Sequence, residues 1–227
     1  MAGQAMASPG RRLDPDCLRL YVVTDRTLAR GRSEVEVVRQ ALAGGATAIQ
    51  LRGKDWSGRE LYRVGRQLRE LTWEAGALFF VNDRLDVAMA VEADGVHLGQ
   101  EDLPLAAARR LAGPDFLIGI TAETVEQGIA AQEAGADYLG TRAVFATPTK
   151  AYREPMGLEE LRRLVQAVSI PVVAIGGINA QNARGVLAAG AAGIGVVSAV
   201  VAAPDIAGAA AELAGIIAAE RGQPHAR

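Results

Sequence analysis

Short apolar runs alternate with longer amphipathic stretches along most of the chain. The apolar runs occupy residues 18–25, 47–52, 77–83, 94–100, 116–121, 137–141, 171–177 and 193–199. Their length suits strands, and their near-continuous apolar character is typical of a parallel sheet that is buried on both faces. The stretches between them carry apolar residues at helical spacing. The pattern therefore predicts a succession of strand-then-helix units.

Two of the amphipathic stretches, residues 33–45 and 57–76, carry clear helix signals. Each begins with serine, a good N-cap, and ends at glycine, which favours a helix C-terminus. Eight strand-and-helix units in 227 residues predict the α/β class and a single (β/α)8 TIM barrel. A doubly wound open sheet is the competing architecture. It is disfavoured because no GxGxxG fingerprint follows the first strand, which continues as TDRTLARGRS.

The two ends of the chain lie outside this alternation. We expect residues 1–17 to be a flexible N-terminal segment, residues 18–220 the catalytic barrel and residues 221–227 a flexible tail. The opening residues are small, polar and basic and have no apolar centre, so they do not resemble a secretory signal. No apolar run reaches the roughly 18 residues of a membrane span. A cytoplasmic enzyme is the expectation.

Composition limits the partners more than it indicates the chemistry. The chain is 50% hydrophobic and 22% charged with a net charge of −2, which is ordinary for a globular protein. The absence of a basic run gives no support for a nucleic-acid partner. The single cysteine, Cys17, cannot form an internal disulfide, and no Cys/His cluster indicates zinc. We therefore expect small-molecule substrates and no membrane partner, and the sequence leaves a homo-oligomer open.

Polar residues follow the carboxyl ends of the predicted strands, where barrels of this class keep their active sites. The amino ends show little comparable polarity. The residues concerned are Gln50, Arg52, Lys54, Asn82, Asp83, His97, Gln100, Asp102, Thr121, Thr147, Thr149, Lys150, Gly176, Gly177, Val197 and Ser198. This asymmetry predicts a ligand site at one end of the barrel.

The stretch AIQLRGKD, residues 48–55, places an amide and two cations close together. Because side chains alternate along a strand, Gln50 and Arg52 project to one face, while Ile49 and Leu51 face the surrounding helices. Lys54 lies past the strand end. This arrangement predicts an anionic ligand at the rim of the barrel.

Two carboxylates, Asp83 and Asp102, follow adjacent predicted strands. Carboxylate oxygens without Cys or His partners suit Mg²⁺, which takes one or two carboxylates and completes its shell with water and phosphate oxygens. Each aspartate could instead cap the next helix, and Pro104 makes that role plausible for Asp102. The cations Arg52, Lys54 and Lys150 at the same end favour Mg²⁺ together with a diphosphate.

A second anion site is indicated after the seventh and eighth strands. Glycines in AIGGI let backbone N–H groups approach a ligand, and Ser198 adds a hydroxyl, as in many phosphate-binding barrels. Alternatively, Gly176 and Gly177 merely form a tight turn. The long segment RAVFATPTKAYREPMG has the length of a binding loop, although its Lys150 could be a solvated surface charge. His97 could titrate near neutrality or be a packed, hydrogen-bonded residue.

The chain from about Leu20 to Ala203 resembles the thiamine phosphate synthases. The resemblance runs through QLRGK, VNDRLDVAMAVEADGVHLGQEDLP, FATPTK, VVAIGGI and GVVSA, in this order and at successive strand ends. It implies a (β/α)8 barrel that joins a hydroxymethylpyrimidine diphosphate to a hydroxyethylthiazole phosphate. The products would be thiamine monophosphate and diphosphate.

The resemblance also implies residue roles. Gln50, Arg52, Lys54 and Asn82 would contact the pyrimidine diphosphate, and Asp83 and Asp102 would bind Mg²⁺. The thiazole phosphate and the diphosphate would be contacted by Thr147, Thr149 and Lys150, and the thiazole phosphate by Gly177, Val197 and Ser198. We expect Arg52, Lys54, Thr121 and Lys150 to carry catalysis in a dissociative substitution that needs no protein nucleophile.

Three positions depart from the family pattern. Thr121 stands where the family usually has serine, Gly53 stands where it often has an acidic residue, and Arg142 stands where it usually has a small residue. The added methyl of Thr121 narrows the space near the reacting carbon. Arg142 could add a diphosphate contact or could crowd the site.

Two other functions remain as rivals. A thiazole tautomerase on the same barrel would need a histidine at the thiazole, and the only histidines are His97 and His225. A non-catalytic sensor of phosphate ligands would bind both substrates without releasing diphosphate.

Overall fold

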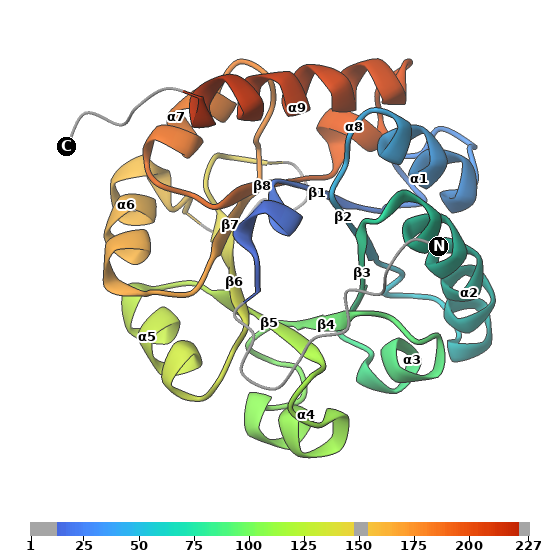
Figure 1. The fold of residues 1–227 in the computed structure, drawn as a ribbon, viewed down its shortest axis with the longest axis horizontal. Coiled ribbons are helices and arrows are strands. Elements are labelled where there is room, and N and C mark those ends of the chain that lie inside the picture. Colours follow the sequence, from blue (N-terminus) through green and yellow to red (C-terminus); the bar gives the residue numbers. More distant parts are fainter. Residues whose placement is uncertain (1–12, 148–153, 223–227) are drawn as a thin grey trace.

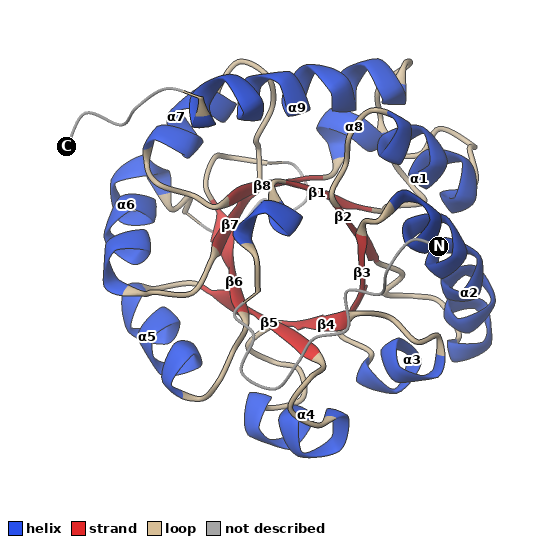
Figure 2. Ribbon diagram, viewed as in Figure 1, coloured by secondary structure: helices blue, strands red, loops and turns tan. Residues whose placement is uncertain are grey.

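The computed structural model describes residues 13–147 and 154–222, and it confirms the α/β class and the (β/α)8 barrel. Eight parallel strands close into a barrel in chain order, with β1 paired to both β2 and β8. Helices form a ring around the strands (Figures 1 and 2). The strands are β1 Leu20–Val23, β2 Ala48–Leu51, β3 Leu78–Asn82, β4 Gly95–Leu98, β5 Leu117–Ala122, β6 Tyr138–Ala143, β7 Val172–Ile175 and β8 Gly193–Val196.

Each strand lies within a predicted apolar run, except that β5 and β6 extend slightly beyond theirs. The helices are α1 Glu34–Ala43, α2 Gly58–Ala75, α3 Leu85–Ala90, α4 Leu105–Ala112, α5 Val125–Glu133, α6 Gly157–Ala167, α7 Ala183–Ala188, α8 Ser198–Val201 and α9 Ile206–Arg221. The predicted serine caps are confirmed, because Ser33 and Ser57 each accept a hydrogen bond from a backbone N–H of the first turn. Gly76 ends α2 with a φ of 68°, which favours glycine.

The alternation of side chains along the strands builds two apolar cores. Outward-facing residues such as Ile49 and Leu51 are fully buried against the helices. A smaller cluster fills the inside of the barrel around Tyr21, Phe80 and Tyr138. The three rings contact one another, with centroids 5.3–6.0 Å apart.

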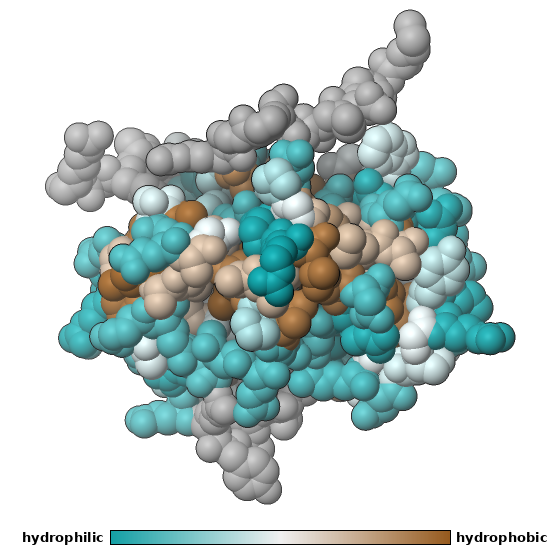
Figure 3. Space-filling model, turned by 90° about the horizontal axis from the view of Figure 1, so that it is seen from below, coloured by the Kyte–Doolittle hydropathy of each residue, from teal (hydrophilic) through white to brown (hydrophobic). Residues whose placement is uncertain are grey.

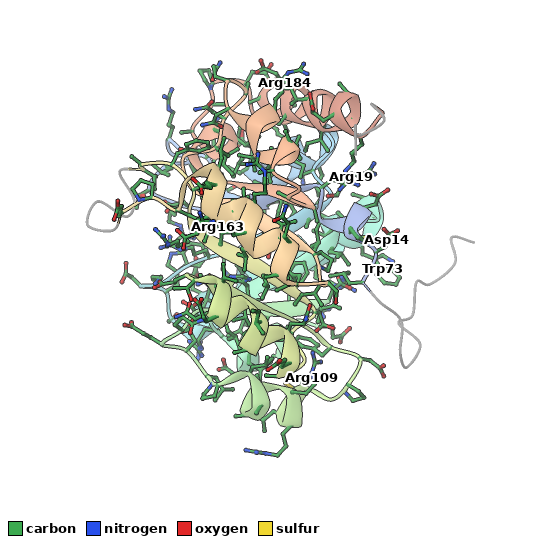
Figure 4. All side chains as sticks on the ribbon, turned by 90° about the vertical axis from the view of Figure 1, so that its left-hand side faces the viewer. Asp14, Arg19, Trp73, Arg109, Arg163 and Arg184 are labelled. Carbon is green, nitrogen blue, oxygen red and sulfur yellow. The ribbon has the colours of Figure 1, made fainter. Side chains whose placement is uncertain are left out.

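The amino end of the barrel is closed by a short 3-10 helix, η1 Pro15–Leu18, which crosses the opening in Figure 1. Leu18 is fully buried, and a Cβ on Gly193 at the start of β8 would overlap the Leu18 carbonyl oxygen. Figure 4 shows Asp14, Arg19 and Trp73 on this same side of the molecule. Because the amino end is closed, a ligand reaches the barrel interior from the carboxyl end.

Polar side chains also lie at the amino ends of the strands, where the sequence indicated little polarity. Asp94 accepts from the N–H of Phe79 at 2.7 Å and from Arg69 at 2.8 Å. Asp137 repeats the arrangement, with the N–H of Ile118 at 2.7 Å and Arg109 at 2.6 Å. Each aspartate thus joins a strand to an arginine on a helix, which is a structural role.

Within the residues that the structure describes, no helix has both the length and the apolar character that crossing a membrane requires.

Candidate active site

A pocket opens at the carboxyl ends of the strands and is lined in part by predicted site residues, although Lys54, Asp83 and Asp102 are not among its lining residues. Its lining comprises Tyr21, Val23, Asp25, Gln50, Arg52, Asn82, His97, Thr121, Tyr138, Gly140, Thr141, Ala143, Thr147, Val173, Ile175, Gly176 and Val197. The sequence had placed Gln50, Arg52, Asn82, Thr121, Thr147 and Val197 among the substrate contacts. The structure therefore brings together residues that are up to about 150 positions apart, as the barrel topology requires.

Arg52 is held at the pocket wall by the residues that follow β1. Its guanidinium lies 3.2 Å from a carboxylate oxygen of Asp25, and its backbone N–H donates to the hydroxyl of Thr24 at 3.0 Å. Asp25 is itself fixed, because it accepts from the backbone N–H groups of Thr27 and Leu28. Only one arm of the guanidinium is engaged by this ion pair, and Arg52 retains other donors for an anion in the pocket.

Gln50 opens a buried line of polar contacts across the barrel interior. Its amide nitrogen donates to the hydroxyl of Tyr21 at 2.9 Å, and that hydroxyl lies 2.9 Å from the hydroxyl of Tyr138. His97 lies between Tyr138 and Thr121, with its Nδ1 3.0 Å from the phenol oxygen and its Nε2 2.9 Å from the threonine hydroxyl. His97 is thus a hydrogen-bonded residue of the pocket wall.

Asp83 and Asp102 form a close pair of carboxyl groups. Burial and a hydrogen bond with Asp102 raise the pKa of Asp83 to about 6, although the charges of Lys54 and Arg52 act in the opposite direction. The pair therefore holds excess negative charge next to the two predicted cations. Asp83 also has a φ of 64°, which is unusual for a residue other than glycine and is typical of functional sites.

Neither aspartate has the helix-capping role that the sequence left open. Arg84 and Pro104 are the residues before α3 and α4, and no side chain caps either helix. Asp102 instead accepts from the N–H of Gly99 at 2.7 Å. Two hard carboxylates close to each other and to Arg52 and Lys54 suit a cation such as Mg²⁺, which fills its remaining positions with water and phosphate.

No group of three or more His, Cys, Asp or Glu side chains that could hold a metal occurs in the described part of the chain. A magnesium site here would therefore depend on two protein carboxylates and on oxygens of a bound substrate.

The backbone bends sharply at the glycine pair after β7. Gly176 and Gly177 have φ values of 97° and 67°, which only glycine adopts easily. They also pack closely against the end of β6 and the loop after it. A Cβ on Gly176 would lie 2.5 Å from Cα of Ala143, and a Cβ on Gly177 would lie 2.8 Å from Cβ of Phe145. Val197 lines the pocket, and Ser198 is exposed at the first position of α8. The phosphate-binding role of Gly177, Val197 and Ser198 stays a prediction.

The loop after β6 is described as far as Thr147, which lines the pocket. Thr149 and Lys150 lie outside the described residues, so their predicted contacts stay predictions. Arg142, the family departure, neither points a free charge at a diphosphate nor crowds the site. It donates to the carbonyl of Glu123 at 2.9 Å, to the carbonyl of Glu154 and to the carboxylate of Glu160 at 2.5 Å.

The other two departures also have physical accounts. A Cβ on Gly53 would lie 2.5 Å from the indole of Trp56. The guanidinium carbon of Arg26 lies over the same indole, 3.6 Å from the ring centroid. A larger residue at position 53 would therefore displace this stacked pair. Thr121 keeps the hydroxyl of the family's serine, and that hydroxyl meets His97.

Sequence reasoning missed Asp25, Tyr21 and Tyr138 as members of the site. Asp25 could have been found, because it comes after the first strand as the other site residues come after theirs. The two tyrosines lie inside apolar runs and have no such signal. Their burial and their contact over 117 positions emerge only when the barrel closes.

Comparison with known proteins gives consistent results. The family model for thiamine monophosphate synthase matches residues 20–200. A thiamine-phosphate synthase of Moorella thermoacetica is 55% identical over 205 residues, covering 90% of this chain and 98% of the relative. One from Pyrococcus abyssi is 55% identical over 200 residues, covering 88% and 95%.

Solved structures agree with the sequence relatives. A thiamine phosphate pyrophosphorylase from Pyrococcus furiosus superposes with a TM-score of 0.86 at 52% identity, covering 92% of this chain and 99% of that one. A 3-hexulose-6-phosphate synthase, 18% identical with a TM-score of 0.70, shares the fold alone. From the family match and the high identity over nearly the full length of the relatives, the chain belongs to the thiamine monophosphate synthase family of transferases.

Proposed function

We propose that the chain condenses a hydroxymethylpyrimidine diphosphate with a hydroxyethylthiazole phosphate to give thiamine monophosphate and diphosphate. The observation that carries this proposal is the charge arrangement at the carboxyl end of the barrel. A carboxyl pair, Asp83 and Asp102, lies close enough to Arg52 and Lys54 for these cations to lower the pKa of Asp83. Such a combination suits a diphosphate that arrives with a divalent cation.

The reaction is a substitution at the methylene carbon of the pyrimidine. The bond from this carbon to the diphosphate oxygen breaks, and the electron pair leaves with the oxygen. The aminopyrimidine ring delocalises the positive charge on the carbon, and the thiazole nitrogen then donates its lone pair to form the new carbon–nitrogen bond. No protein nucleophile is required, so the residues act by charge stabilisation and orientation.

Each side chain has a defined part in this scheme. Arg52 and Lys54 stabilise the charge that grows on the departing diphosphate, and Lys150 adds a third cation. Asn82 contacts the same substrate, while Gln50 and Thr121 orient the pyrimidine portion. Held by Asp83 and Asp102, Mg²⁺ would neutralise diphosphate charge as a Lewis acid.

The thiazole phosphate is held separately, so that its nitrogen faces the reacting carbon. We assign its phosphate to Gly177, Val197 and Ser198, and Thr147 and Thr149 contact it from the loop after β6. Fixing both reactants in one pocket raises their effective concentration greatly, which supplies much of the rate enhancement in reactions of this type.

The decisive experiment supplies both substrates and Mg²⁺ and measures thiamine monophosphate and diphosphate together. We expect thiamine monophosphate and diphosphate in equal amounts. In a single-turnover experiment without the thiazole phosphate, we expect neither product. Binding of both substrates by calorimetry without product would favour the sensor. Isomerisation of a thiazole substrate without diphosphate release would favour the tautomerase.

A second copy of the chain is a further candidate partner. Exposed apolar side chains lie on α3, on α4 and just before α4, namely Met89, Leu103 and Leu111. The side of the molecule that carries α4 shows a band of apolar surface with a polar surround (Figure 3). Sedimentation velocity over a range of concentrations tests self-association. The cytoplasmic location and the division at residues 17 and 220 likewise remain proposals.

A further inference from the structure

The line of polar contacts along the pocket wall is continuous across five strands. It runs from Gln50 on β2 through Tyr21 on β1, Tyr138 on β6 and His97 on β4 to Thr121 on β5. Its four contacts measure 2.9, 2.9, 3.0 and 2.9 Å. All four distances are those of well-formed hydrogen bonds. The two tyrosines and Gln50 are buried, and all five residues of the line also line the pocket.

Two glycines hold the rings of this line in place. A Cβ on Gly119 would lie 2.1 Å from the Tyr138 ring, and a Cβ on Gly140 would lie 2.7 Å from the His97 ring. Each ring therefore lies directly against the backbone of a neighbouring strand. The Tyr138 and His97 rings also contact each other, with centroids 5.5 Å apart. This packing fixes the positions of the two rings, and with them the atoms that make these contacts.

Counting protons along the line gives it a direction. The Gln50 amide nitrogen is only a donor, so the Tyr21 oxygen accepts there. Burial raises the pKa of both tyrosines above the usual value, and each phenol keeps its single proton. The proton of Tyr21 then goes to the Tyr138 oxygen, and the proton of Tyr138 goes to Nδ1 of His97.

The direction continues through the histidine. Because Nδ1 accepts, the ring proton of a neutral His97 sits on Nε2, which donates to the Thr121 hydroxyl oxygen. The hydroxyl proton of Thr121 is then left to point into the pocket. If the Gln50 amide were flipped, its oxygen would accept from the Tyr21 hydroxyl. The directions of the hydrogen bonds from Tyr21 to Thr121 would then no longer be fixed.

We propose that Gln50 sets the direction of a hydrogen-bond chain that fixes His97 as its Nε2-protonated tautomer and presents the Thr121 hydroxyl proton to the bound pyrimidine diphosphate. Tyr21, Tyr138 and His97 are thus positioning residues that act through Thr121. The inference deepens the proposed function and rests on it for the identity of the substrate, but the tautomer is a property of the protein alone.

The first test measures that tautomer without substrate or metal. The sequence has two histidines, so ¹⁵N-labelled His225→Gln protein without a histidine tag gives the signals of His97 alone in a two-bond ¹H–¹⁵N correlation spectrum. We expect a protonated Nε2 and an unprotonated Nδ1. A protonated Nδ1, or an even mixture of tautomers, would overturn the proposal.

The second test exchanges donor and acceptor at the Gln50 end of the hydrogen-bond line. Gln50→Glu replaces the donor with an acceptor, so the direction should invert and His97 should become the Nδ1-protonated tautomer. Tyr138→Phe removes the hydroxyl that donates to Nδ1 of His97. His97 should then be a mixture of its two tautomers. The folded state of each variant is checked by circular dichroism. A purely structural role predicts the same tautomer in all the folded variants, and that result would overturn the proposal.

Steady-state kinetics then test whether the hydrogen-bond line affects turnover through Thr121. Thr121→Val should lose about 10-fold or more in kcat, the value of one hydrogen bond of about 1.4 kcal/mol. Thr121→Ser, which restores a hydroxyl at this position, should recover most of that loss. Tyr138→Phe should lower kcat on its own but have little further effect in the Thr121→Val background. Independent, multiplicative effects would overturn the coupling. A protein with the expected tautomer but without thiamine monophosphate would contradict the proposed function instead.

Discussion

At the scale of single residues, Asp83 combines an unusual backbone with an unusual carboxyl group. Its φ is 64°, and its backbone N–H donates to the carbonyl of His97 at 2.9 Å. The position beside Asp102 is unfavourable for a charged carboxylate. A conformation and a charge that both cost free energy are retained at sites where a ligand compensates for them.

This arrangement makes the stability of the metal-free protein depend on pH. The pKa of Asp83 is about 6 in the folded protein and near 3.9 in an unfolded chain, so the folded state binds more protons in between. The contribution of Asp83 to the free energy of unfolding should therefore fall as the pH rises from about 4 to about 6. Above that pH it should not change further. Adding Mg²⁺ should raise the melting temperature at pH 7.5 but scarcely at pH 4.5.

Thermal unfolding with and without Mg²⁺ at both pH values checks this prediction. The variant Asp83→Asn is the control, and it should lose both the pH dependence and the magnesium effect. An equal magnesium effect on the variant would contradict the assignment of the cation to this pair.

Arg52 is expected to act on turnover more than on folding. Its guanidinium side chain is about one-third exposed. Its partner Asp25 is largely buried but keeps hydrogen bonds from the backbone N–H groups of Thr27 and Leu28, so we expect Arg52→Ala to fold. Removing one preorganised charge contact typically costs about 10²–10³ in rate. We expect a loss of that order in kcat/KM, measured by the formation of thiamine monophosphate. Arg162→Ala, which removes an exposed arginine on α6, should keep full activity.

At the scale of elements, the paired aspartates at the amino ends of β4 and β6 join strands to helices. Asp137 accepts from a backbone N–H and from Arg109, so Asp137→Ala leaves two donors without this partner. We expect a loss of about 2–3 kcal/mol in the free energy of unfolding, because hydrogen bonds to charged groups are among the stronger ones. Urea denaturation measures it. Asp115→Ala, at an exposed position nearby, should change stability by less than about 0.5 kcal/mol.

The loop after β6 depends on Arg142 in a similar way. This side chain joins the loop after β5 to the start of α6 through Glu123, Glu154 and Glu160. Arg142→Ala should displace the segment that carries Thr147. We expect a loss of about 10- to 100-fold in kcat/KM for the thiazole phosphate, since small misplacements of binding groups are costly.

Steady-state kinetics with each substrate varied in turn would check the Arg142 prediction. The loss should be larger for the thiazole phosphate than for the pyrimidine diphosphate. Arg163→Ala is a matched control, because this arginine on α6 pairs with Glu159 on the outer surface and is labelled in Figure 4. An equal loss in the control would show that α6 itself, and not the loop, is responsible.

At the scale of the whole molecule, the barrel interior limits which glycines can change. Gly119 lies against the Tyr138 ring, so Gly119→Ala forces the ring or the strand to move and should cost about 1–3 kcal/mol. Gly215 lies exposed within α9 with open space around it, and Gly215→Ala should stabilise the protein by about 0.5–1 kcal/mol. Thermal unfolding of both variants checks the contrast, and equal effects would contradict the description of the interior.

The sequence was sufficient for the repeating part of the fold. Alternation of apolar runs and helical stretches determines the strand order, because each run is a local pattern and a parallel barrel joins its units consecutively. The carboxyl-end positions of Arg52, Asn82 and Thr121 could be predicted from the same regularity. Each of these features depends on residues that are close together in the chain.

Contacts across the barrel were not predictable in this way. That Tyr138 meets Tyr21 and His97 depends on which inward-facing side chains share a level, and that is set by the register of all eight strands together. Likewise, the partner of Arg142 and the ring beside Gly53 belong to loops whose paths carry no periodic signal. Tertiary packing decided these cases.

The closed strand order has a consequence for the connectivity of the chain. Since β1 pairs with β8 and Arg221 at the end of α9 contacts Asp16 in η1, the first and last described elements are neighbours. A peptide bridge between them would preserve every strand pairing, and the chain could then be opened at another surface loop. The order in which the units are synthesised is therefore separable from the geometry they form: the barrel is cyclic in space although the polypeptide is linear.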